Sequence, residues 1–146
     1  MLVTTVIAAT APLPATPALL IVHGLFGSAR NWGVIARHFA ISRDVVSVDM
    51  RNHGQSPWSD HHRYIDMAED LAEVITAHGA PMDVLGHSMG GPITQRALLV
   101  LGDKIQAASI WSGSGFGPSR NIDEPYLPTS LVRWILSSAS KPLTRD

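Results

Sequence analysis

The chain has 146 residues, the length of one domain, and its 45% hydrophobic and 16% charged residues exclude a disordered chain. Its 11 basic and 12 acidic residues give a formal net charge of -1, so we do not expect a nucleic acid partner. The chain has no cysteine, which excludes disulfide bonds, thiolate metal ligands and a thiol nucleophile.

The first predicted element is an edge strand over residues 3–7, where most side chains are β-branched. A signal peptide is the alternative interpretation of this apolar start. However, no basic residue precedes His23, and the apolar run is far shorter than the roughly 18 residues that span a bilayer. We therefore expect a soluble, cytoplasmic protein without a membrane span.

Prolines at 12, 14 and 17 predict an irregular connector, after which strands and helices alternate. The runs ALLIV (18–22) and VVSV (45–48) have no polar alternation, which is typical of strands buried on both faces of a parallel sheet. A short third strand is predicted at 82–85 and a fourth strand at 105–111. Three helices are predicted at 31–40 with Asn31 as cap, at 64–78, and at 91–101.

The predicted helix over residues 64–78 has the clearest apolar face. That face comprises five side chains at helical spacing: Met67, Leu71, Val74, Ile75 and His78. Alternation of strands and helices indicates an α/β fold, a mostly parallel sheet flanked by helices on both sides. Residues 112–119 predict a loop and residues 131–136 a short apolar helix, which either covers an open face of the sheet or begins a lid. We expect residues 1–120 to belong to the core and residues 121–146 to begin a helical cap.

The strongest chemical signal is Gly86-His87-Ser88-Met89-Gly90, between a predicted strand and a predicted helix. In that context G-x-S-x-G forms a nucleophile elbow. The sharp turn forces the serine into a strained conformation and lifts its hydroxyl above the sheet, beside the positive end of the next helix. Side chains at Gly86 and Gly90 would clash, so glycine is needed there. The alternative is a turn of small residues without chemistry.

A second glycine turn, His23-Gly24-Leu25-Phe26-Gly27-Ser28, follows the first buried strand. An enzyme of acyl transfer needs two donors for the oxyanion of its tetrahedral intermediate. We expect these to be the backbone N–H groups of Leu25 and Met89. The alternative is a plain turn. We interpret His23 itself as a buried structural histidine.

The segment after residue 48 is rich in polar side chains. Arg51 is expected to pair with Asp49 or with a neighbouring loop. Histidine side chains commonly serve as bases, which makes His53 a conceivable base, but a polar network that stabilises the turn is the favoured interpretation. Four further residues resemble metal ligands in composition only, and we interpret them as a solvated loop: Asp60, His61, His62 and Asp66. No metal site and no cofactor are predicted.

These residues resemble the α/β-hydrolase superfamily, especially small cytoplasmic esterases of the YbfF type, over about residues 18–112. The resemblance rests on three motifs in the order of that family: His23 to Ser28, Asp49-x-Arg51-Asn52-His53-Gly54-x-Ser56, and Gly86 to Gly91. It implies a serine hydrolase with Ser88 as nucleophile, Leu25 and Met89 as oxyanion donors, and small acyl esters as substrates. It also implies a helical cap after the fourth parallel strand.

The sequence departs from that family in one respect. The family order is serine, acid, histidine, but no histidine follows Ser88. The acids after Ser88 are Asp103, Asp123, Glu124 and Asp146, and none ends the strand predicted at 105–111. The chain is therefore either the N-terminal part of a serine hydrolase, truncated before the last strands and nearly inactive alone, or a short non-catalytic module for binding or scaffolding. An unfinished sheet leads us to expect self-association through its exposed edge.

Overall fold

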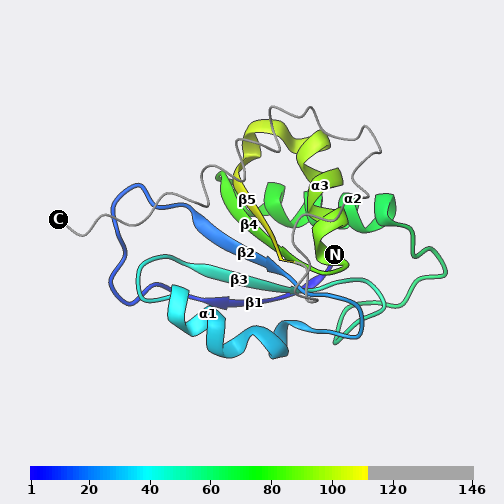
Figure 1. The fold of residues 1–146 in the computed structure, drawn as a ribbon, viewed down its shortest axis with the longest axis horizontal. Helices are drawn as coiled ribbons and strands as arrows, with labels where there is room; N and C mark the ends of the chain where they lie inside the picture. Colours follow the sequence, from blue (N-terminus) through cyan, green and yellow to red (C-terminus); the bar gives the residue numbers. More distant parts are fainter. Residues whose placement is uncertain (112–146) are drawn as a thin grey trace.

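The computed structural model describes residues 1–111. Its sheet has five strands in the described residues, in the order β1-β3-β2-β4-β5 (Figure 1). The four strands β2 to β5 run parallel to one another, and β1 pairs antiparallel with β3. The strand bounds are Val3–Ile7 for β1, Ala18–Val22 for β2, Val45–Asp49 for β3, Met82–His87 for β4 and Ile105–Trp111 for β5. The predicted mostly parallel α/β fold is confirmed.

Helices cover both faces of the sheet (Figure 1). A 3-10 turn at Ala29–Trp32 leads into α1 (Gly33–Phe39), which lies on one face. The helices α2 (Tyr64–His78) and α3 (Gly90–Leu101) lie on the other, and a second 3-10 turn (Gly102–Lys104) leads into β5. Each connection between parallel strands crosses a face of the sheet. The carboxyl ends of the parallel strands therefore all lie at the same end of the sheet.

The central strand β2 contributes to the core on both faces of the sheet. Leu20 and Val22 pack in the cluster beneath α2 and α3, whereas Leu19 and Ile21 pack in the cluster beneath α1. All four side chains are buried. Successive side chains of a strand point to opposite faces, so a strand covered on both sides shows an uninterrupted apolar run.

Three local predictions were wrong. Asn31 does not cap the helix: Trp32 is at the N-cap position of α1, and Asn31 lies in the preceding 3-10 turn, where its side chain accepts the backbone N–H of Ser28, the cap of that turn. His78 is exposed, because it lies in the last turn of α2, beyond the residues that pack on the sheet. The strand β4 continues two residues past Leu85, as far as His87.

The strand β1 is an exposed edge, as predicted from its β-branched residues. Its side chains are exposed along most of its length, and the Val3 N–H donates to Ser56 Oγ at 2.8 Å. Within the described residues no helix is long and apolar enough to cross a membrane. The predicted loop at 112–119, the helix at 131–136 and the cap at 121–146 lie outside the described residues.

Candidate active site

Ser88 occupies the turn between β4 and α3. Its φ is 51°, in the left-handed region, where an L-residue other than glycine is strained by about 1 to 2 kcal/mol. The side chain is exposed, and the Ser88 carbonyl accepts the Gly91 N–H at 2.9 Å to close the turn. The hydroxyl forms no hydrogen bond within residues 1–111. The turn thus holds an accessible hydroxyl at the N-terminus of α3, in the expected conformation.

The glycines on either side of Ser88 allow two backbones to approach closely. A Cβ on Gly86 would lie 2.5 Å from the Gly90 carbonyl oxygen and 2.6 Å from Thr94 Oγ1. A Cβ on Gly90 would lie 2.5 Å from the carbonyl oxygen of Val22 in β2. Because real side chains do not tolerate such distances, a sharp turn from β4 into α3 requires glycine at both positions.

The turn after β2 lies directly against the elbow. A Cβ on Gly24 would lie 2.9 Å from Nδ1 of His87 and 3.0 Å from Cβ of Ser88. The Gly27 N–H donates to the Gly24 carbonyl at 3.0 Å, which closes this turn around Leu25. In the described part of the chain, the N–H groups of Leu25 and Met89 have no hydrogen-bond acceptor. Both remain available to a ligand beside Ser88.

Two cavities border Ser88, and Leu25 lines both. The first has a volume of about 320 Å³ and is walled by aromatic and apolar side chains, among them Phe26, Trp32 and Ile35. The ring of His87 also lines it and meets Trp32 edge-on, with centroids 5.5 Å apart. The second cavity has a volume of about 340 Å³. Its lining comprises Leu25, His62, Tyr64, Met67, Ser88 and Met89.

His23 is a structural residue, as predicted. It is buried, its Nδ1–H donates to the Gly24 carbonyl at 2.8 Å, and its Nε2 accepts the Met50 N–H at 3.0 Å. Burial lowers the pKa of His23 below its usual value. With both ring nitrogens occupied, His23 ties the turn after β2 to the end of β3 and has no free nitrogen for catalysis.

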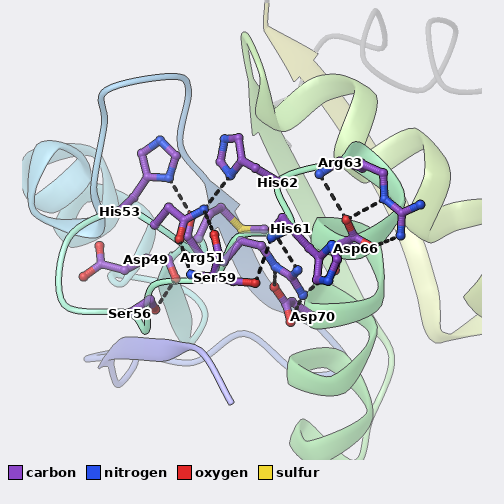
Figure 2. Close-up of polar contacts among 12 residues, drawn as sticks. Asp49, Arg51, His53, Ser56, Ser59, His61, His62, Arg63, Asp66 and Asp70 are labelled. Atoms are coloured by element: carbon purple, nitrogen blue, oxygen red, sulfur yellow. Dashed lines mark hydrogen bonds and ion pairs between the residues drawn. The ribbon is translucent and has the colours of Figure 1, made fainter.

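Asp49 and Arg51 do not form an ion pair with each other, because each side chain binds other groups. The Asp49 carboxylate accepts the Ala29 N–H at 2.7 Å and the Gln55 N–H at 2.9 Å, which joins the loops after β2 and β3. Arg51 instead forms a two-pronged ion pair with Asp70 of α2, at 2.6 and 2.9 Å, and its Nη1 donates to the His61 carbonyl of the neighbouring loop at 3.1 Å, the predicted alternative (Figure 2). Hydrogen bonding to Asp70 raises the pKa of Arg51.

The interpretation of Asp66 as part of a solvated loop was wrong. Asp66 is buried in the first turn of α2, where it accepts from the Arg63 side chain at 2.7 and 2.9 Å (Figure 2). It also accepts the Arg63 backbone N–H at 3.1 Å and so caps the helix. Hydrogen bonds from Arg63 lower the pKa of Asp66 to about 2. Among the described residues, no group of three or more His, Asp or Glu side chains is arranged to hold a metal ion.

Asp66 makes the stability of the chain depend on pH in a definite window. Its folded pKa of about 2 lies below its ordinary value of 3.8, so its stabilising contribution is complete above that ordinary value and is lost as the pH falls towards 2. We expect Asp66→Asn to lower the urea midpoint at pH 6 and to have little effect near pH 2. Glu69→Gln, on the exposed side of α2, is the control. An equal cost of Asp66→Asn at both pH values would contradict this role.

Within the described residues, no basic side chain forms a hydrogen bond with the Ser88 hydroxyl. His53 donates from Nδ1 to the Arg51 carbonyl at 2.8 Å and belongs to the turn after β3, as predicted. Asp103 lies in the 3-10 turn before β5, whose first residue pairs with Met82 at the start of β4. Because Ser88 follows the last residue of β4, Asp103 and Ser88 lie at opposite ends of the strands. Asp123, Glu124 and Asp146 lie outside the described residues.

Comparison with known proteins identifies relatives of this arrangement. A family model described as "alpha/beta hydrolase fold" matches residues 17–137. The esterase YbfF of Escherichia coli is 40% identical over 88 residues, which are 60% of this chain and 35% of that protein. A "Probable alcohol acetyltransferase" of Saccharomyces cerevisiae is 42% identical over 90 residues, 57% of this chain and 26% of that protein.

A solved structure supports the same grouping. The structure titled "Marine microorganism esterase" has a TM-score of 0.68 and 34% identity to this chain. The match covers 75% of this chain and 40% of that one. The chain therefore spans only about a quarter to two fifths of the length of these relatives.

Proposed function

This chain belongs to the alpha/beta hydrolase family, and we propose that it carries the nucleophile half of an enzyme that cleaves carboxylic esters through an acyl-enzyme on Ser88. The observation that carries the proposal is the exposed Ser88 hydroxyl, held at φ 51° between two cavities and beside two N–H groups without acceptors in the described residues. The esterase relatives support ester substrates.

The proposed reaction begins when Ser88 Oγ adds to the carbonyl carbon of the ester and its proton passes to a histidine base. The carbonyl oxygen becomes an oxyanion, which the N–H groups of Leu25 and Met89 bind. Loss of one such donor typically costs about 3 kcal/mol of transition-state stabilisation. The intermediate then expels the alcohol, which takes a proton from the histidine. Water attacks the resulting acyl-enzyme, releases the acid and restores Ser88.

The histidine base and the acid that orients it are proposed to lie in sequence beyond residue 146. Two observations support this. All seven histidines of the chain precede Ser88, whereas the family order places the base after the serine. The relatives are also two to four times as long as the matched part of this chain.

Hydrolysis of p-nitrophenyl acetate tests this proposal on two polypeptides, the 146-residue chain and the full-length product of the reading frame that contains it. We expect a burst and steady turnover from the full-length product and a rate little above buffer from the 146-residue chain. Rapid, Ser88-dependent turnover by the 146-residue chain would contradict a missing base. An inactive full-length product would instead favour the non-catalytic binding or scaffold module.

A further inference from the structure

We propose that His62 is a specificity-determining residue, whose Nε2–H donates to a second oxygen of the ester in the cavity that His62 shares with Ser88. This inference rests on the proposed function of Ser88. His62 and Ser88 line the same cavity of about 340 Å³, together with Leu25 and Met89, whose N–H groups we assign to the oxyanion. Ser88 also borders the first cavity, so the inference places one group of a substrate attached at Ser88 in the second cavity, beside His62.

The proton on the His62 ring can be located from its neighbours. The Ser59 N–H donates to Oδ1 of Asn52 at 2.6 Å, which fixes the orientation of the Asn52 amide. Nδ2 of Asn52 then donates to the Ser59 carbonyl at 2.9 Å and faces Nδ1 of His62 at 3.0 Å. Because an amide NH₂ only donates, Nδ1 of His62 accepts, and the proton of the neutral ring lies on Nε2.

The ring is also held in place. Its face stacks on His53, with centroids 5.7 Å apart and an interplanar angle of 29°, and Figure 2 shows both rings on the same side of the loop. His53 in turn packs against buried His23, at 4.9 Å, and its Nδ1 is bound to the Arg51 carbonyl. Within residues 1–111, Nε2 of His62 has no partner. An oriented, exposed donor thus lines the same cavity as the nucleophile, and no described residue accepts its hydrogen bond.

The other residues that line this cavity include three apolar side chains, so one polar contact has a large effect on which ligands bind there. Met67 is fully buried, and Leu25 and Met89 have apolar side chains, so the side-chain donors of this lining are His62, Tyr64 and the nucleophile Ser88. A donor in a largely apolar site discriminates in favour of ligands that carry an acceptor. The substrate class is therefore an ester with an ether, carbonyl or hydroxyl oxygen a few bonds from the scissile carbonyl, in either its acyl or its alcohol group.

Two isosteric ester pairs test the inference on the full-length product and distinguish the two sources of the oxygen. Ethyl methoxyacetate and ethyl butyrate differ by an oxygen in the acyl group, and 2-methoxyethyl acetate and butyl acetate differ by an oxygen in the alcohol group. His62→Phe keeps the aromatic ring but removes the donor. We expect it to lower kcat/KM about fivefold for the ether member of one pair, the size of one neutral hydrogen bond, and about twofold or less for its carbon isostere.

Two further variants separate this effect from a structural one. His62→Gln retains an N–H donor and should restore part of the preference for the ether ester. His61→Phe, at the exposed neighbouring position outside the cavity, should leave both ratios unchanged. Equal effects of His62→Phe on both members of both pairs would overturn the inference while leaving the function of Ser88 intact.

A readout without turnover completes the test. In the Ser88→Ala protein, long-range ¹H–¹⁵N spectra of the His62 ring should show the proton on Nε2, and this nitrogen signal should shift with the ether esters but not with their isosteres. That result would support the inference even if the protein proved inactive. A proton on Nδ1, or identical shifts with both members of each pair, would overturn it.

Discussion

Ser88→Ala in the full-length product is expected to lower kcat for p-nitrophenyl acetate by at least about 10⁴-fold, because no other group then forms the acyl-enzyme. The exposed hydroxyl lies in a turn closed by backbone hydrogen bonds, so its loss should leave the fold unchanged. The control is Ser42→Ala. Ser42 lies between α1 and β3, at the opposite end of the sheet, and within residues 1–111 its hydroxyl donates a hydrogen bond to the Phe39 carbonyl and to no other group.

The residual activity of Ser88→Ala also carries information. The N–H groups of Leu25 and Met89 remain in this variant, so slow, serine-independent hydrolysis above the buffer rate is expected from oxyanion binding alone. Circular dichroism and urea unfolding should match the wild-type protein. If Ser88→Ala lost both its activity and its fold, the variant would not support a nucleophilic role for Ser88. If Ser88→Ala kept full activity, it would contradict that role.

Gly86→Ala is expected to destabilise the protein by about 3 kcal/mol and to displace the elbow. The added Cβ would meet the Gly90 carbonyl and Thr94 Oγ1, and neither can move easily. The Gly90 carbonyl belongs to the first turn of α3, and the buried Thr94 hydroxyl donates to that same carbonyl at 2.8 Å. To relieve the clash, β4 and α3 must therefore move apart. This movement displaces Ser88, which lies in the turn that joins them.

Gly79→Ala provides a matched control for this prediction. Gly79 caps α2 at φ 79°, and a Cβ there would meet nothing within 4 Å. Gly79→Ala introduces backbone strain but no clash, whereas Gly86 is not at positive φ and Gly86→Ala introduces the clash; we expect Gly79→Ala to cost about 1 kcal/mol and to leave kcat unchanged. Urea unfolding of both variants, with kcat for each, separates the two effects. A cost of Gly86→Ala no larger than that of Gly79→Ala would contradict the close approach of β4 and α3.

Much of the fold could be predicted because the residues of a single segment indicate its secondary structure and its burial. The apolar run at 18–22 indicates burial on both faces without reference to any partner, and the structure buries it between two clusters. The bounds of α2 follow from the period of its apolar face and from Gly79, which ends the helix in the left-handed conformation. The conformation at Ser88 was also predictable, because a tight turn between strand and helix requires it.

The sequence did not reveal the contacts that depend on packing. The partner of Arg51 is Asp70, and only the position of α2 against the end of β3 brings them together. Asp66 was misassigned although one signal was available: an acid in the first turn of a helix commonly caps it. His62 had no such signal, since its cavity is formed by residues from the loop after β2, the elbow and α2.

The most direct test of the central claim is the site of covalent labelling. The full-length product is treated with a fluorophosphonate, digested and analysed by mass spectrometry, with and without excess ester. We predict one phosphonylated residue, Ser88, in the peptide that contains Gly86 to Gly90, and protection by the ester. A label on a different serine, or an active enzyme whose Ser88 stays unmodified, would contradict the assignment of Ser88 as the nucleophile.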